Sequence, residues 1–305
     1  MTADLLLSKA IEGFLIARRA DGYAPQTLEQ YQWALKMLLE FGDLPLSRID
    51  TPHLRNFMAS IQHRPNLSAT SAFHVWKSLR AFFKWLSAEG LTGRPDHGLT
   101  KPKYAHREIK PLTEEEIRAL IKAAEYTKIT EGRRKPFRMK RPTAERDKAL
   151  LLILLDTGIR ASELCRLEPS DVDLKNSTIT IRPHRSGLKS RARIIPIGQS
   201  TRKALWRYIA KYDPPEGKPL FNMDRTSLTR LVVRMGDRAG VHGVHPHRFR
   251  HTFAIQYLRN GGDVFTLQRI LGHSTLSMVQ HYLALADADA QTAHRKASPA
   301  DNWKL

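Results

Sequence analysis

The stretch HGVHPHRFRH, residues 242–251, concentrates residue types that could do chemistry, with four histidines and two arginines in ten positions. His247 and His251 stand four residues apart, a spacing that places both on one helical face and is common among zinc ligands. Against a metal site, Arg248 and Arg250 repel a cation, and no Glu stands between the histidines as a metalloprotease requires. Guanidinium groups beside imidazoles favour an anion, above all a phosphate.

A second stretch, LGHSTLSMVQHYLAL at residues 271–285, contains a tyrosine with two possible roles. Its apolar spacing predicts a helix over 275–285, with Ser274 as the N-cap and Tyr282 on the apolar face. Taken in isolation, Tyr282 is most simply interpreted as a packed residue whose hydroxyl lies at the edge of the core. A phenol can also act as a nucleophile, but its pKa of about 10 then requires a proton acceptor or a strongly positive surrounding.

The charge of the chain indicates a polyanionic partner. Fifty Lys and Arg stand against thirty Asp and Glu, which gives a net charge of +20 and a pI near 10.3. Before residue 111 there are 15 basic and 10 acidic residues, and after it 35 basic and 20 acidic, so both parts are basic. Nucleic acid is the commonest partner of such a protein, and a merely basic surface is the alternative.

The 305 residues are enough for two domains, each with its own core. Residues 98–111 have no apolar period and contain two prolines, so we interpret them as a linker between domains 1–97 and 112–305. The single cysteine, Cys165, excludes an internal disulfide framework and suits a reducing cytoplasm. The longest apolar run, residues 149–155, is too short to span a membrane, and the N-terminus lacks the pattern of a signal peptide.

The first domain is predicted to be helical. Apolar periodicity predicts helices over 8–22, 24–42, 51–61 and 68–90. Thr27 and Gln30 form a candidate capping box for the second of them. The apolar stripe predicted for the last helix is Phe73, Trp76, Leu79, Phe83 and Leu86. The opposite face carries basic residues that could contact phosphates or form a solvated face, namely His74, Lys77, Arg80 and Lys84.

The second domain is predicted to mix helices with a small β-hairpin. Thr113 and Glu116 form a capping box, and 145–158 reads as a buried helix with a shorter helix directly after it. Strand-like runs at 177–183 and 191–198 enclose a basic turn, and the remaining predicted helices are 199–212, 225–239, 247–260, 263–271 and 275–285. Two basic loops supply further candidate DNA contacts, which are Arg133, Arg134, Arg138, Lys140 and Arg141 in the first and Arg185 and Arg191 in the second.

Five motifs in order resemble the tyrosine recombinase family, the phage-type integrases. They are TGIRASEL with Arg160, GLKSRAR with Lys189, HRFR with His247 and Arg250, LGH with His273, and Tyr282 nine residues later. The resemblance spans nearly the whole chain. It implies a mainly α, α+β fold in which a helical, SAM-like core-binding domain and a mixed catalytic domain with a small antiparallel sheet form a C-shaped clamp around DNA.

The resemblance also implies a role for each residue. Arg160 and Arg250 grip the scissile phosphate, Tyr282 is the nucleophile, and the other catalytic residues are His247, His273 and Lys189. Lys189 departs from the family pattern, since it precedes Arg193 by four residues where family hairpins often have five.

The chemistry explains these residue types. A phosphodiester under attack gains negative charge, and without carboxylates to hold Mg²⁺ that charge must be met by fixed cations, which arginines provide at any working pH. His247 could take the phenol proton, and Lys189 could protonate the departing 5′ oxygen. A tyrosine ester conserves the phosphodiester energy, so rejoining needs no ATP.

The implied function is site-specific recombination of double-stranded DNA by a homotetramer, with no metal or other cofactor, in an enzyme of the Xer kind or a small mobile-element integrase. The residues after Tyr282, with Trp303 as an anchor, could pack onto a neighbouring subunit or form a frayed terminus. Two alternatives are a type IB topoisomerase and a DNA-binding regulator without catalytic activity. The core-binding domain and the tail argue against the first, and the complete set of site residues argues against the second.

Overall fold

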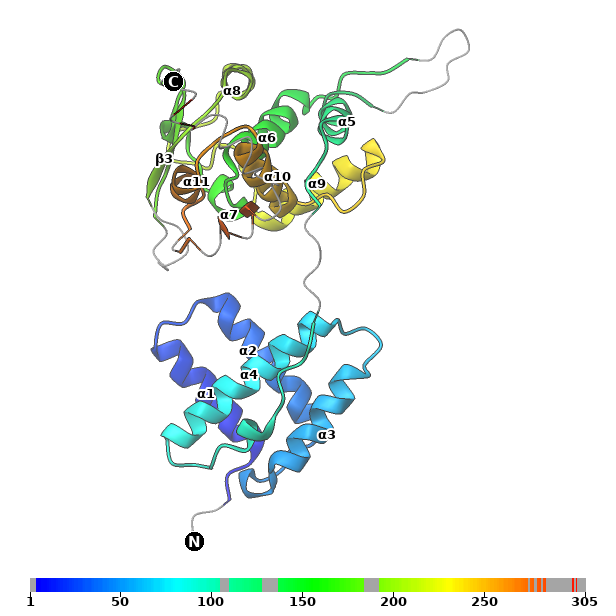
Figure 1. Cartoon of the computed structure of the whole chain (residues 1–305), viewed down its shortest axis with the longest axis vertical. Helices are drawn as coiled ribbons and strands as arrows, with labels where there is room; N and C mark the ends of the chain where they lie inside the picture. The colour runs from blue at the N-terminus through cyan, green and yellow to red at the C-terminus, as the bar shows by residue number, and fades with distance from the viewer. Residues whose placement is uncertain are drawn as a thin grey trace. The chain divides into compact units, whose positions relative to one another are not determined.

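The computed structural model describes residues 4–104, 110–127, 137–183 and 192–273, together with 275–276, 279–280, 282–283, 298 and 300. The chain divides into two compact units, Met1–Arg107 and Glu108–Leu305 (Figure 1). Within the described part, none of the helices is both long and apolar enough to cross a membrane.

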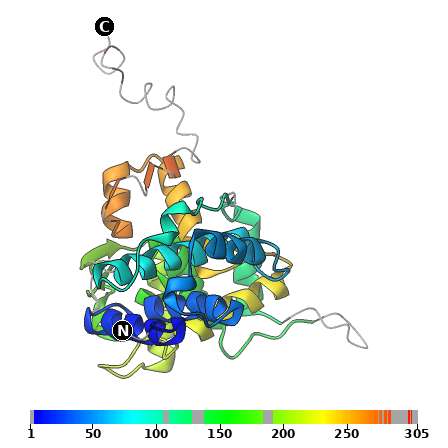
Figure 2. The ribbon, with the colours of Figure 1, turned by 90° about the horizontal axis from the view of Figure 1, so that it is seen from below.

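The first unit is a bundle of helices around an aromatic core. Figures 1 and 2 show its helices in blue to cyan, packed around one another. Phe14, Phe57 and Phe82 are buried at its centre, where Phe14 and Phe82 meet edge to face with ring centroids 5.4 Å apart. The elements are α1 (Leu7–Ala20), α2 (Pro25–Phe41), the 3₁₀ turn η1 (Leu46–Arg48), α3 (Thr51–Gln62), α4 (Ala69–Ala88) and the 3₁₀ turn η2 (Pro95–Gly98).

Two sequence predictions for this unit are wrong in detail. The capping box at Thr27 does not form, because α2 begins at Pro25, whose fixed φ suits the first helical position. The core face of α4 is rotated from the predicted stripe, so that Phe73 and Trp76 are half-buried and stack on each other with centroids 5.8 Å apart. The residues that α4 buries are Ala72, Val75, Ser78, Leu79, Phe82, Phe83 and Leu86.

The second unit packs helices around α6 and a small antiparallel sheet. The sheet has the order β1-β2-β3, with Ile179 opposite Ile195 in the buried register. The two predicted strands are confirmed, whereas the two-residue β1 was too short to show a pattern. The elements are α5 (Glu114–Glu125), α6 (Ala144–Thr157), α7 (Ala161–Leu164), η3 (Pro169–Asp171), β1 (Val172–Asp173), β2 (Thr178–Ile181), β3 (Arg193–Pro196), α8 (Gln199–Tyr212), α9 (Arg225–Ala239), α10 (Pro246–Arg259) and α11 (Val264–Leu271).

Local signals explain most helix ends. The capping box of Thr113 and Glu116 forms at α5, and Asp263 caps α11, which ends at Gly272 with φ 64°. The shorter helix predicted after residue 160 is α7, which spans only Ala161–Leu164. Of the predicted helix 275–285, residues 277–278, 281 and 284–285 lie outside the described residues.

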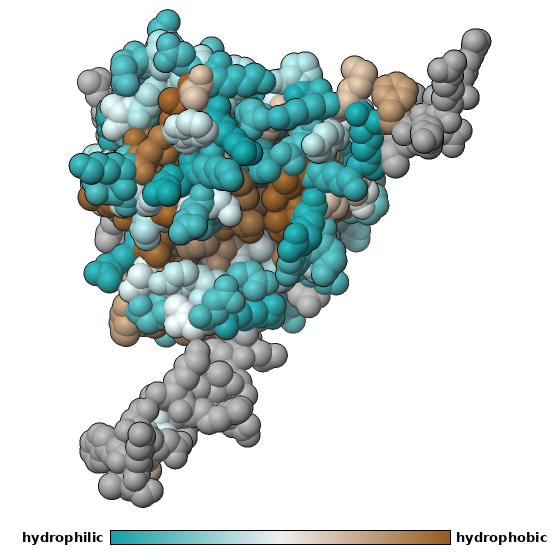
Figure 3. Space-filling model, turned by 90° about the horizontal axis from the view of Figure 1, so that it is seen from above, coloured by the Kyte–Doolittle hydropathy of each residue, from teal (hydrophilic) through white to brown (hydrophobic). Residues whose placement is uncertain are grey.

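Apolar side chains also reach the surface of the second unit. Figure 3 shows them gathered in a hollow on one face. A cavity of about 770 Å³ in the second unit is lined in part by Leu152, Leu155, Phe253 and Tyr257 of α6 and α10. None of the predicted catalytic residues that the structure describes lines this cavity.

The turn after α6 places the first arginine. Thr157 closes the helix by donating from its hydroxyl to the Ile153 carbonyl (2.6 Å) and accepting from the Ile159 amide (3.2 Å). Gly158 follows with φ 57°, and a Cβ at this position would lie 2.5 Å from Phe253 and 2.8 Å from Leu271. Only glycine therefore fits this turn, both in conformation and in space.

We expect Gly158→Ala to destabilise the protein more than Gly240→Ala. Both glycines have positive φ, but a Cβ at Gly240 meets no atom within 4 Å. The control should cost about 1–2 kcal/mol from backbone conformation alone, and Gly158→Ala about 1–3 kcal/mol more from overpacking. Urea unfolding of both variants measures the difference, and equal losses would contradict the steric argument.

Candidate active site

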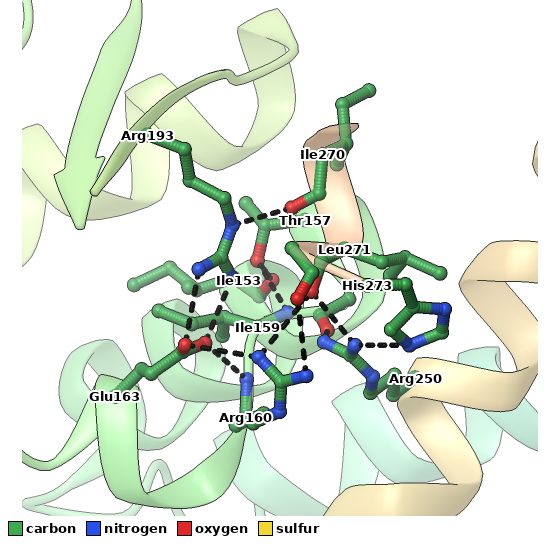
Figure 4. A network of polar contacts seen from close by, with 12 residues as sticks. Ile153, Thr157, Ile159, Arg160, Glu163, Arg193, Arg250, Ile270, Leu271 and His273 are labelled. Atoms are coloured by element: carbon green, nitrogen blue, oxygen red, sulfur yellow. Dashed lines mark hydrogen bonds and ion pairs between the residues drawn. The ribbon is translucent and has the colours of Figure 1, made fainter. Parts of the chain in front are cut away.

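Arg160 and Arg250 come from distant parts of the chain and meet at one carbonyl. Arg160 begins α7, and Arg250 lies on α10. The Leu271 carbonyl accepts from Nη1 of Arg160 at 3.4 Å and from Nη2 of Arg250 at 2.8 Å (Figure 4). Arg250 also donates to the Gly158 carbonyl at 2.6 Å, so the glycine turn holds both arginines.

Each guanidinium keeps donors for a ligand. Arg160 donates to Glu163, Leu271 and Gly272, and Arg250 to Gly158, Leu271 and His273, so the described contacts of each engage three N–H groups. An arginine carries about five N–H groups, which leaves some on each side for an anion. Burial and the nearby Arg160 charge lower the pKa of Arg250 to about 9, and it stays charged at neutral pH.

The end of α11 binds three arginines. Nε of Arg193 donates to the Ile270 carbonyl at 2.6 Å, and the next two carbonyls accept from Arg160. A helix C-terminus has carbonyls without intrahelical partners and carries partial negative charge, so it stabilises cations. Figure 4 shows these side chains pointing to the end of α11.

His273 is a neutral donor without an acceptor. Its Nε2 lies 2.7 Å from Nη2 of Arg250, and because arginine can only donate, Nε2 must accept and the proton must be on Nδ1. Burial, then the charges of Arg250 and Arg160, lower the pKa of His273 to about 4. Its Nδ1 is buried and has no partner in the described part of the chain. A phosphate oxygen would satisfy this N–H.

Glu163, which the sequence analysis did not select, offsets the positive charge. It pairs with Arg160 (3.2 Å) and Arg193 (2.8 Å), and its side chain is 1% exposed. Burial alone would raise its pKa, but the hydrogen bonds and charges of Arg193 and Arg160 outweigh burial and lower it to about 2. The available signal was its position three residues after Arg160, where it also accepts from the Arg160 amide at 3.0 Å.

Tyr282 lies beside the histidines. It is 5% exposed, and its ring is nearly parallel to that of His273 at 6.4 Å. Burial raises the pKa of Tyr282, whereas the charges of Arg250 and Arg160 lower it. Its hydroxyl oxygen lies 2.9 Å from Nδ1 of His251, within hydrogen-bond distance. His247, which its chemistry made a candidate proton acceptor, contacts the His251 ring edge-on at 4.2 Å, and burial and Arg250 lower its pKa.

The other residues of the HGVHPHRFRH stretch stabilise the fold. His245 caps α10 by accepting from the Arg248 amide at 3.2 Å. Arg248 pairs with Glu116 at 3.2 Å and donates to the Lys110 carbonyl at 3.0 Å, which joins α10 to α5. Among the described residues, no three His, Cys, Asp or Glu side chains are grouped so that they could hold a metal ion.

The candidate DNA contacts on α4 divide into two kinds. Lys77 and Lys84 are exposed, and they lie on the same face of the helix, two turns apart. Arg80 instead pairs with the fully buried Asp96 at 3.3 Å. His74 is half-buried, and its Nδ1 lies 3.1 Å from Nε2 of Gln30.

The basic loop after α5 is described only at its base. Tyr126 and Lys140 form an antiparallel bridge, and Arg138 and Lys140 are exposed, although Lys140 pairs with Glu145 at 2.6 Å. Arg141 is half-buried. The predicted residues that lie outside the described residues are Lys189, Arg133, Arg134, Arg185, Arg191 and Trp303.

We expect Glu163→Gln to cost about 3–5 kcal/mol, because it leaves two arginines uncompensated in a buried site. Glu114→Gln is the matched control, since Glu114 pairs with Arg118 at 2.5 Å but is 70% exposed, and it should change stability by less than about 1 kcal/mol. Urea unfolding at pH 7 measures both.

The pairing of Glu163 with Arg160 and Arg193 also predicts that the stability of the protein depends on pH. The pKa of Glu163 in the folded protein, about 2, lies below its ordinary 4.5, so its stabilisation is complete above about 4.5 and is lost as the pH falls through about 2. The stability difference between wild type and Glu163→Gln should therefore shrink below pH 4.5. A constant difference would contradict the assigned pairing.

Comparison with known proteins agrees with this geometry. Residues 110–289 match the protein family described as "Phage integrase family". Residues 11–92 match the family described as "Phage integrase, N-terminal SAM-like domain". Tyrosine recombinase XerA of Thermococcus onnurineus is 29% identical over 300 residues, covering 95% of this chain and 96% of that protein. Tyrosine recombinase XerC of Thermodesulfovibrio yellowstonii is 30% identical over 277 residues, covering 86% of each.

The fold is similar to that of solved integrases. Lambda integrase, as a dimer bound to a COC′ core site, matches with a TM-score of 0.72 at 20% identity, covering 94% of this chain and 78% of that chain. The Tn1549 transposon integrase, in complex with a circular intermediate DNA, matches with a TM-score of 0.72 at 19% identity, covering 90% and 94%. From its family matches over both units and its arginine pair, the chain belongs to the phage integrase family and is a tyrosine recombinase of the Xer-like type.

Proposed function

We propose that this recombinase cleaves and rejoins DNA at a specific site through a 3′-phosphotyrosyl bond to Tyr282. The observation that supports this most strongly is the convergence of two guanidinium groups and the unpartnered N–H of His273 beside the tyrosine ring. All of these groups donate hydrogen bonds, so the site suits an oxyanion.

In the proposed reaction, the scissile phosphate binds between Arg160 and Arg250. Their remaining N–H groups meet its non-bridging oxygens, and Nδ1 of His273 donates to one of them. As the tyrosine oxygen attacks, these donors stabilise the charge that grows on the phosphate oxygens. Because the pKa of His273 is about 4, it contributes a hydrogen bond rather than a positive charge at neutral pH.

The leaving group needs a proton, since an alkoxide is a stronger base than a phenolate. We assign this role to Lys189, as its place between the two strands suggests. The ester formed with Tyr282 keeps the energy of the broken bond, so a 5′ hydroxyl from another strand can attack it and restore the DNA without ATP. The residues assigned here supply the positive charge and the proton for the leaving group.

The proposed partner is double-stranded DNA with a recombination site. Exchange of strands between two duplexes needs four copies of the active site. We therefore propose a homotetramer on DNA, which agrees with a related structure, the lambda integrase tetramer bound to a Holliday junction. The enzyme would act in the cytoplasm, on the nucleoid.

We expect wild-type protein to form a denaturant-resistant adduct with a nicked duplex that carries its natural site, and to do so in EDTA. Tyr282→Phe should form none, because it lacks the attacking oxygen while keeping the ring that packs in the core. Gel electrophoresis in denaturant detects the adduct. An adduct that persists in Tyr282→Phe would refute the assignment.

The net charge of +20 predicts that the affinity for DNA depends steeply on salt concentration. Affinity for the site should fall linearly on a plot of log K against log salt, because each neutralised phosphate releases counterions. Lys77→Ala and Lys84→Ala should each reduce the slope by about 1. Lys9→Ala is the control, since Lys9 pairs with Glu12 at 3.0 Å on α1, and an equal effect of all three changes would contradict contact through α4.

A further inference from the structure

The contact between His251 and Tyr282 has a consequence for the reaction. The phenol oxygen lies 2.9 Å from His251 Nδ1, within hydrogen-bond distance, whereas His247 is described in contact with the His251 ring rather than with the phenol. We propose that His251 accepts the proton of Tyr282 during attack. This proposal rests on the proposed function and adds a catalytic residue to it.

The position of His251 on α10 explains how it reaches the tyrosine. Consecutive helical residues point about 100° apart, so Arg250 can face the carbonyls of Gly158 and Leu271 while His251 faces Tyr282. His251 is half-buried and its ring lies 5.5 Å from the tyrosine ring. One helical turn therefore carries both a phosphate-binding group and a group that touches the nucleophile.

Proton transfer along this contact is chemically balanced. The Tyr282 hydroxyl donates to Nδ1, which leaves the proton of the neutral imidazole on Nε2. When the bond from the tyrosine oxygen to phosphorus forms, the phenol proton passes to Nδ1 and the bond from phosphorus to the 5′ oxygen breaks. That oxygen takes its proton on the opposite side of the phosphate, from Lys189 under the proposed function. The resulting imidazolium lies next to the phosphoryl group and offsets its negative charge.

The surroundings of Tyr282 make an acceptor necessary. Burial raises the pKa of the phenol, so without an acceptor the anion would be scarce at neutral pH. The described titratable groups in contact with His251 are His247, edge-on at 4.2 Å, and Tyr282 itself. Removal of His251 should therefore slow the loss of the phenol proton.

The test uses His251→Asn in the full chain on the nicked duplex. The Asn side chain can accept the phenol hydrogen bond near the position of Nδ1, but it cannot take up the proton. We expect single-turnover adduct formation to slow by about 10²-fold or more at pH 7, and the variant rate to rise with pH where the wild-type rate levels off. His247→Asn, the matched control, should not acquire that rising pH dependence.

A second substrate distinguishes deprotonation of the tyrosine from protonation of the leaving group. In a duplex with sulfur at the 5′ bridging position, the leaving thiolate needs no proton, so the rate of Lys189→Ala should recover and that of His251→Asn should not. DNA affinity and the urea unfolding midpoint of His251→Asn should match wild type. If that variant does not fold, His251→Gln receives the same measurements.

The outcomes are distinguishable. A wild-type rate in His251→Asn, recovery with the sulfur substrate, or a slow rate with an unchanged pH profile would each overturn the role of His251 while leaving recombination intact. An adduct in Tyr282→Phe would instead overturn the proposed function itself.

Discussion

The confinement of three like charges is the constraint around which the second unit is built. Arg160, Arg193 and Arg250 must be held close together without a ligand, although their mutual repulsion opposes this. Glu163 supplies one buried negative charge, and the carbonyls at the end of α11 supply partial ones. Arg160 and Arg250 are therefore satisfied on their protein side and can present their other N–H groups to an anion.

The same arrangement explains the state of the histidine. Because Arg250 donates to Nε2 of His273, the imidazole is fixed in the tautomer that carries its proton on Nδ1. The Nδ1–H group therefore points away from Arg250. Its low pKa follows from burial and from the positive charges of Arg250 and Arg160. Electrostatics thus makes His273 a donor of constant form across the physiological pH range.

The sequence was informative where a signal is local. The capping box at Thr113, the end of the predicted helix 263–271 and the strand-like runs of β2 and β3 depend on neighbouring residues, and they are confirmed. The start of α2 was wrong because Pro25 outweighs the Thr27 pattern, and the face of α4 was misplaced because the packing of other helices decides which aromatic residues are buried. Motif order selected Arg160, Arg250, His273 and Tyr282, which the structure brings together. Glu163 and His251 were missed as site residues because their roles depend on contacts with residues distant in sequence.

The turn that follows α11 serves two purposes at once. Its backbone oxygens bind the arginines, and the chain leaves it directly into His273 and the segment that carries the tyrosine. An insertion of one amino acid between Ile270 and His273 would displace the carbonyls that bind the arginines relative to His273 and Tyr282. The length of this short run is therefore tightly constrained, and a different C-terminal segment grafted onto this scaffold should be joined after it.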